Sequence, residues 1–322
     1  MLPIVLSAVL LVIAGITFFI LTQTRSQADS IFTNANVTNA APVVDSIFVN
    51  EVANQRVAQY NDGSVTPIIP TAGGTKTIYV NGVISDANGV GSNYQSGNLK
   101  DVRLKFFRAK EGTGHLCSPD RNDCYVSQVS CMITPKDETS VYYSCEIPLH
   151  YFADSTVSGG TYPSDKWVAR ITATDDSDAT GMSNVNTVEV ASVLALSIPP
   201  SINYGTLVRA QSTTSDNNVE MVITQLGNVE ADVEISGGDM TCSIFGTIPA
   251  ANQKWSKTDV GAADLTSSGI SGSASATSLG LTRRTDETMA LTKSLFFNLV
   301  MPAAVSGTCS GTVNITAIPV AM

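Results

Sequence analysis

Histidine and the motifs of catalysis are scarce in this sequence. His115 and His150 are the two imidazoles among 322 residues, so a serine or cysteine triad would have to use one of them. No nucleophile motif, phosphate-binding loop or metalloprotease signature is present. Two tryptophans leave little aromatic surface for a cleft that cleaves glycosides. We therefore expect a protein that is not an enzyme.

Charge is also sparse. Charged residues make up 14% of the chain, and 28 acidic side chains outnumber 18 basic ones. Because no basic patch is present, we do not expect a nucleic-acid partner. Glycine, serine, threonine, asparagine and valine are abundant instead, which favours strands joined by tight turns. The composition predicts an all-β fold, and the length suffices for two domains.

None of the six cysteines precedes residue 117, and no CxxC pair occurs. His115 lies two residues before Cys117, so a mixed metal site is the rival of disulfide bonding. Disulfides are the preferred interpretation, and they imply an oxidising compartment. The expected bonds are Cys117–Cys124 around a polar loop, Cys131–Cys145 across a hairpin, and Cys242–Cys309 between two strands of one sandwich.

The first charged side chain is Arg25, and residues 2–21 read LPIVLSAVLLVIAGITFFIL. As a helix, this segment would span roughly 30 Å, the thickness of the bilayer's hydrocarbon core. One interpretation is a secretory signal that is cut after Ala28, and another is an uncut signal anchor. Both would normally carry basic residues before the apolar run, and none precedes it here. The third interpretation, a helix whose basic leader has already been removed, explains that absence.

The apolar run resembles the N-terminal helix of type IV pilins, above all archaeal pilins and flagellins. A proline near the start, Pro3, precedes Ile4, Val5 and a run of leucine, valine, isoleucine and alanine. Bacterial type IV pilins usually carry glutamate at the fifth position, where this chain has Val5, so the archaeal type is the better match. The resemblance implies a helix that lies in the membrane and then packs against copies of itself in a filament core. The residues assigned to this helix are Pro3, Val5, Ser7, Ala8, Leu11, Ala14, Gly15 and Phe18.

Alternating hydrophobicity begins after a polar linker. We expect the hydrophobic helix at 1–33, the linker at 34–42, and two Ig-like β-sandwich domains at 43–194 and 195–322. In the first, Val102, Leu104 and Phe106 alternate with basic residues, as in a half-buried strand. The stretch WVARITATDDSDATGMSNVNTVEV is similar to the closing hairpin of bacterial Ig-like surface domains.

The second domain is expected to open after a proline-containing hinge at 197–201. Two alternating runs, 219–223 and 229–235, flank Gly227-Asn228 and predict a hairpin. Residues 256–282 are rich in serine, glycine, alanine and threonine, which predicts long surface loops.

Two kinds of modification or binding site are candidates. Asp175, Asp176 and Asp178 share one turn, which is either a calcium site or a set of solvated carboxylates. Asn36 and Asn314 begin N-glycosylation triplets, and Asn314 would have to face outward from a strand. Calcium is thus the one candidate cofactor.

The preferred functional hypothesis is a homopolymeric, type IV pilus-like filament at the cell surface, with the sandwiches exposed for adhesion to a receptor or glycan. A membrane-anchored Ig-like adhesin or surface-layer protein that does not polymerise is the alternative. A secreted binding module released by cleavage near Ala28 is the third.

Overall fold

The computed structural model describes residues 38–51, 66–90, 99–110, 117, 120–127, 129–264, 266–286 and 291–320. The predicted helix at 1–33, with its eight assigned residues, and the candidate glycosylation site Asn36 lie outside these ranges. Within them, no helix is long and apolar enough to cross a membrane.

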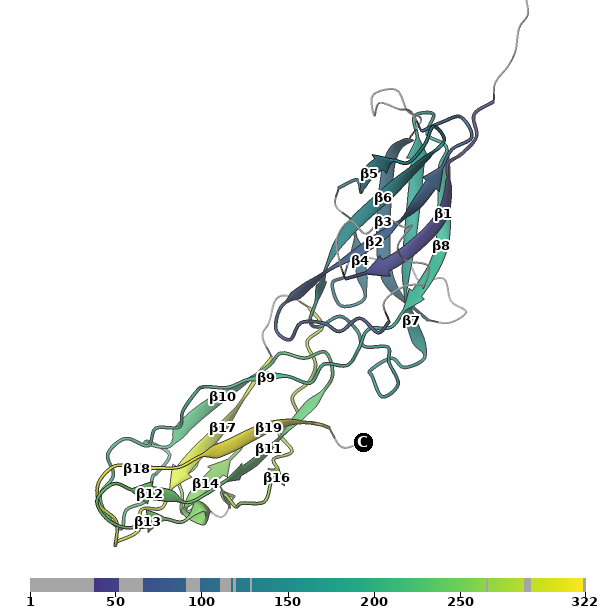
Figure 1. Ribbon diagram of the computed structural model, residues 1–322. Coiled ribbons are helices and arrows are strands. Elements are labelled where there is room, and N and C mark those ends of the chain that lie inside the picture. Colours follow the sequence, from purple (N-terminus) through teal and green to yellow (C-terminus); the bar gives the residue numbers. More distant parts are fainter. Residues whose placement is uncertain are drawn as a thin grey trace, which may run out of the picture. The chain divides into compact units, whose positions relative to one another are not determined.

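The described chain is all-β (Figure 1). The strands between residues 43 and 188 form two four-stranded antiparallel sheets with the orders β1-β2-β6-β5 and β4-β3-β7-β8. We call this part the first sandwich. Its strands are β1 (Val43–Asn50), β2 (Thr75–Ser85), β3 (Leu99–Lys110), β4 (Cys124–Val126), β5 (Met132–Pro135), β6 (Ser140–His150), β7 (Asp165–Asp175) and β8 (Thr180–Val188).

The remaining strands form the second sandwich. A five-stranded sheet has the order β15-β14-β17-β10-β9, and two three-stranded sheets have the orders β16-β11-β19 and β13-β12-β18. The strands are β9 (Leu196–Ser197), β10 (Val219–Gln225), β11 (Ala231–Gly237), β12 (Met240–Cys242), β13 (Thr247–Ile248), β14 (Gln253–Ser256), β15 (Ser268–Gly269), β16 (Ser275–Ala276), β17 (Thr292–Leu299), β18 (Cys309–Ser310) and β19 (Val313–Pro319). The 3-10 turn η2 (Ala250–Asn252) precedes β14.

Alternation along the strands forms the core of the first sandwich. Val102, Leu104 and Phe106 of β3 are buried, as their spacing predicts, and Trp167 of β7 stacks on Phe106 with ring centroids 5.0 Å apart. From the opposite sheet, Ile78 belongs to the same hydrophobic cluster. Because alternate side chains point to opposite faces of a strand, each sheet contributes one apolar face to this core.

The predicted hairpin around Gly227-Asn228 is wrong. β10 pairs with β17 and β9, whereas β11 pairs with β19 and β16, so the two runs lie in different sheets. A Cβ atom at Gly227 would lie 2.0 Å from the carbonyl oxygen of Val193, so this residue is held against another segment. The backbone N–H of Asn228 donates to the same oxygen at 3.0 Å. The Gly-Asn pair therefore directs the chain from one sheet to the other.

The predicted surface loop at 256–282 also needs correction. It contains β15 and β16, and Ile270, Leu279 and Leu281 are buried in the core of the second sandwich. Leu281 and Ala231 exchange backbone hydrogen bonds of 2.7 and 2.9 Å, which attach the segment to β11. The segment is rich in serine and glycine, and its apolar residues are spaced too irregularly to match the period of a strand or of a helix.

Three disulfide bonds join the six cysteines as Cys117–Cys124, Cys131–Cys145 and Cys242–Cys309. The second spans the β5–β6 hairpin, where Met132 pairs with Ser144 and Pro135 with Val141. The third joins directly opposed residues of β12 and β18.

Asp232 of β11 should make the stability of the second sandwich depend on pH. Burial alone would raise the pKa of its carboxyl, but the backbone N–H groups of Val233 and Leu279 and the hydroxyl of Thr277 donate to it and hold the pKa below its usual value. A carboxyl with a lower pKa in the folded state stabilises the fold above its unfolded pKa near 4 and loses that contribution as the pH falls through the folded pKa.

We therefore expect Asp232→Asn to lower the free energy of unfolding by about 1 kcal/mol or more at pH 7, the scale of hydrogen bonds to a charged group. The difference from the unchanged protein should shrink toward pH 2, where the carboxyl is neutral. Urea unfolding between pH 2 and 7 measures it. An equal difference at all pH values would contradict this role of the charge.

Candidate functional site: a buried aspartate and its two arginines

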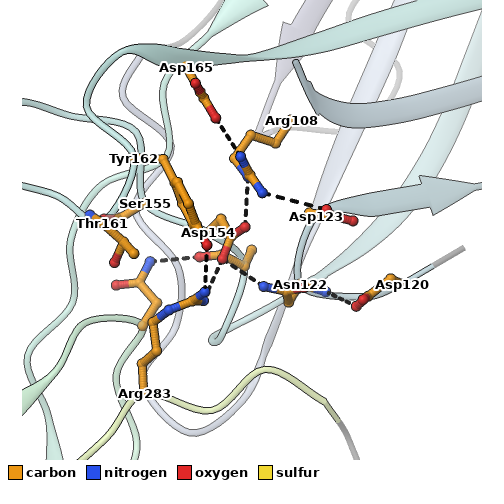
Figure 2. Close-up of polar contacts among 12 residues, drawn as sticks. Arg108, Asp120, Asn122, Asp123, Asp154, Ser155, Thr161, Tyr162, Asp165 and Arg283 are labelled. Carbon is orange, nitrogen blue, oxygen red and sulfur yellow. Dashed lines mark hydrogen bonds and ion pairs between the residues drawn. The ribbon is translucent and has the colours of Figure 1, made fainter. Parts of the chain in front are cut away.

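The largest set of buried charged groups in the described chain surrounds Asp154 (Figure 2). Asp154 follows β6 in the segment that leads to β7, and its side chain is fully buried. One carboxylate oxygen accepts a hydrogen bond from Arg108 Nε at 2.7 Å. The other accepts from Arg283 Nη1 at 2.5 Å and from Asn122 Nδ2 at 2.6 Å. The Asp154 carboxylate thus accepts hydrogen bonds from three donors, and two of these, Arg108 and Arg283, are cationic.

Arg108, on β3, is shared among several acids. It also donates to Asp165 at the start of β7, and its Nη2 lies 3.6 Å from Asp123. The guanidinium carbon stands 3.8 Å from the ring centroid of Tyr162, a cation–π contact. The backbone carbonyl of Asp154 in turn accepts a 2.8 Å hydrogen bond from Trp167 Nε1, which ties the cluster to the first hydrophobic core.

The second sandwich contributes its own polar residues to this region. Arg283 Nη2 donates to the hydroxyl of Tyr162 at 3.0 Å, and Arg284 Nη1 donates to the hydroxyl of Tyr151 at 3.0 Å. Asn228 is fully buried, and its Nδ2 donates to the carbonyl oxygens of Ala153 and Ala191 at 2.9 Å each. We call Arg108, Asp154, Tyr162, Asn228 and Arg283 the junction cluster, because it joins segments more than a hundred residues apart.

Desolvation and opposite charge compete at this cluster. Burial raises the pKa of the Asp154 carboxyl, and the charges of Arg283 and Arg108 oppose that rise. Burial would lower the pKa of the Arg108 guanidinium, but Asp154 and Asp165 outweigh it and raise that pKa overall. Arginine stays protonated in proteins, so the cluster is an ion-pair network.

The chemistry of the cluster is structural. Both carboxylate oxygens of Asp154 accept hydrogen bonds from donors of the same chain. His150 has a packed environment as well, because its ring stacks on Tyr125 with centroids 6.3 Å apart and lies 3.3 Å from Arg121 Nη1.

The three aspartates proposed for calcium are not brought together. Both carboxylate oxygens of Asp175 are occupied, one by the backbone N–H groups of Ser177 and Ala179 at 2.8 Å and the other by Asn39 Nδ2 at 2.6 Å. Asp178 pairs instead with Lys100 at 2.6 Å. Among the described residues, no three acidic, histidine or cysteine side chains converge as metal ligands. The hydrogen bond from Asn39 and those from the turn lower the pKa of Asp175.

The side chain of the second candidate glycosylation site faces outward, as an attached glycan requires. Asn314 lies on β19 and is exposed, while its backbone pairs with Ser236 of β11. A glycan attached to this side chain would project from the outer face of the sheet.

Sequence reasoning did not find the junction cluster. Arg108 lies just beyond the predicted strand at 102–106, Asp154 follows an apolar run, and Arg283 follows the predicted loop at 256–282, so no local pattern connects them. The one available signal is that Arg108, Asp154 and Arg283 are charged residues next to apolar segments in a chain that has few charges.

Comparisons with known proteins give little more. No family model matches the chain, and no curated protein matches it. Among solved structures it is similar to a chain from one described as "Chaperone-tip adhesin complex is vital for synergistic activation of CFA/I fimbriae biogenesis". That match has 12% sequence identity and a TM-score of 0.27, and it covers 86% of this chain and 85% of the other.

Loss of the central charge should be costly. In Asp154→Asn, the two largely buried arginines keep their charges but lose the fully buried carboxylate between them, so we expect a loss of about 3 kcal/mol or more of unfolding free energy. Asp178→Asn is the matched control, because its ion pair with Lys100 is exposed and worth less than about 1 kcal/mol. Guanidinium unfolding measures both. Equal, small effects would show that the cluster adds nothing to stability.

Proposed function

We propose that this protein is a structural subunit of an extracellular, type IV pilus-like filament. Its apolar N-terminal segment would pack with other copies in the filament core, and the β-sandwiches would be displayed outside. The observation that carries the proposal is the pairing of twenty uncharged residues, Leu2 to Leu21, with a disulfide-bonded all-β region. The first part suits a bilayer and a helical core, and the second suits an oxidising exterior.

The internal connections of the β region support a mechanical role. A filament subunit must transmit force between its segments without unfolding. Cys242–Cys309 and Cys131–Cys145 fasten strands covalently, and the junction cluster links β3 and the segment after β6 to Arg283. These connections maintain the fold of the β region.

An adhesive role is supported by one further observation. In the second sandwich, Ile244 and Phe245 are 76% and 62% exposed, on the β12–β13 loop that begins directly after Cys242 of the Cys242–Cys309 disulfide. Backbone hydrogen bonds between Phe245 and Ser306 hold that loop in place. Large apolar side chains displayed on a fixed loop are typical of a contact with another molecule. This feature would serve a filament subunit and a membrane-anchored adhesin equally.

Assembly is the property to test. Burying even half of the side chains between Ile4 and Leu21 at about 1.5 to 3 kcal/mol each would outweigh surface charge effects. We expect filaments that tolerate high salt and dissolve in detergents that solvate apolar helices. Gly15→Phe and Ala8→Phe should abolish filaments, because a large side chain would keep helix backbones apart, whereas Gly15→Ala should be tolerated.

Electron microscopy of sheared surface material, beside a blot of the membrane fraction, measures assembly and insertion separately. The phenylalanine variants should remain in the membrane fraction with their disulfides intact. If the unchanged protein is abundant yet only membrane-bound monomer is found, the anchored adhesin or surface-layer protein replaces the filament subunit.

A further inference from the structure

Strand β19 is the last described strand, and it has a sheet neighbour on one side only. It pairs with β11 along its whole length, from Val313 opposite Gly237 to Pro319 opposite Ala231 (Figure 1). Within the part of the chain that the structure describes, no strand or side chain bonds to its other edge. An unpaired edge exposes a row of N–H and C=O groups that can pair with another chain.

The register identifies the backbone groups at this free edge. On β11, Ala231 exchanges hydrogen bonds with Leu281, the carbonyl of Val233 accepts from Thr277, and the N–H of Gly237 donates to Ser271. All of these partners lie on the side away from β19. Since backbone groups of alternate residues point to opposite sides of a strand, the intervening β11 residues face β19. On β19, therefore, Val313, Ile315 and Ala317 direct their backbone groups outward.

Among the described strands, two other long edge strands, β1 and β8, have neighbouring segments that cover them. β1 and β8 lie beside each other in the first sandwich (Figure 1). The chain that enters β1 packs on β8, because a Cβ atom at Gly181 would lie 1.7 Å from the carbonyl oxygen of Pro42. Asn39 also reaches Asp175 at 2.6 Å. Among the described residues, none forms a hydrogen bond with the free edge of β19.

Charge distinguishes this edge from the rest of the protein. The chain carries a net charge of −10, so two copies repel each other in general. From Ser294 to the last residue, however, the sequence contains no acidic, basic or histidine side chain. The segment from Val190 to Val208 is uncharged as well. Edge strands that must remain single usually carry lysine or inward-pointing charge, and β19 has only Pro319 at its end.

A groove lies along the same strand. It has a volume of about 350 Å³ and is lined by Ile198, Ile202, Tyr204, Met221, Val313 and Ile315, among others. The Tyr204 hydroxyl is buried and finds no hydrogen-bond partner among the described residues. Burial raises the pKa of this hydroxyl, so it stays protonated and remains a donor. Both the backbone and this side chain thus have hydrogen-bonding capacity left on one face.

We propose that β19 pairs edge to edge, in antiparallel orientation, with β19 of a second copy of this chain. A second copy is the favoured occupant because this uncharged edge is where two acidic molecules can meet without opposing like charges. Pro319 has no N–H and ends the ladder, so the outward groups of Val313, Ile315 and Ala317 define the register. Ile315 would lie opposite Ile315 of the second copy, and Asn314 would lie opposite Thr316.

This register can be tested by cross-linking. Asn314 and Thr316 are exposed, and across the new pair they form a non-hydrogen-bonded position with Cα atoms about 4.5 Å apart, which suits a disulfide. Full-length Asn314→Cys and Thr316→Cys variants are produced without glycosylation, purified in detergent and oxidised alone or mixed. The mixture should form several-fold more cross-linked dimer than either variant alone, and peptide mapping should find the 314–316 bond.

Charge variants supply the second measurement. Asn314→Lys/Thr316→Lys places lysine opposite lysine and should abolish dimers in analytical ultracentrifugation. Asn314→Glu/Thr316→Lys places opposite charges across the pair and should retain them. Thermal unfolding checks that both variants fold.

Equal cross-linking in all samples, or identical behaviour of the two charge variants, would overturn the β19 pairing, as would a cross-link in another register. Detergent suppresses association through the apolar N-terminal segment, so a negative result would leave the filament proposal untouched. If the unchanged protein forms β19 dimers but no surface filaments, that result would count against the proposed filament function and leave the β19 pairing standing.

Discussion

The desolvated carboxylate of Asp154 is the constraint on which the β region depends. A buried charge must be neutralised by fixed groups, and here Arg108 lies 46 residues before Asp154 in the sequence and Arg283 lies 129 residues after it. The arginines need partners in turn, which Asp165 and Tyr162 supply. Each contact is satisfied only when β3, the segment after β6 and residue 283 are all in place. The cluster thus specifies one arrangement of these segments, whatever its net contribution to stability.

The sequence was informative where a pattern is local. In β3, Val102, Leu104 and Phe106 alternate with basic residues, and period-two alternation has few structural outcomes other than a half-buried strand. The Cys131–Cys145 pair could be predicted for the same reason, because the two cysteines are equally spaced about a short turn. Such inferences require only neighbouring residues and the geometry of a pleated strand.

The failures concern partners that are distant in sequence. Gly227-Asn228 has the composition of a hairpin turn, yet Asn228 is held by Ala153 and Ala191, far away in the chain. Tertiary hydrogen bonds outweigh the local turn preference there. Likewise, no sequence motif marks Asp154 and Arg283, because two opposite charges can form a buried ion pair whatever their separation in the sequence. Irregular spacing concealed the buried residues of 256–282, where Ile270 and Leu279 enter the core without forming long strands.

The distribution of charge connects the fold to assembly. Ionisable side chains are few in this chain. Several of them lie at the junction cluster and in turns such as that of Asp175, and β19 has none. An acidic surface keeps copies apart in solution, but an uncharged edge on the same molecule permits approach in one orientation. Because β19 itself carries no charged side chain in a chain with a net charge of −10, association through β19 would be selective. Such selectivity depends on the absence of charged side chains from β19 as much as on attractive contacts between the two strands.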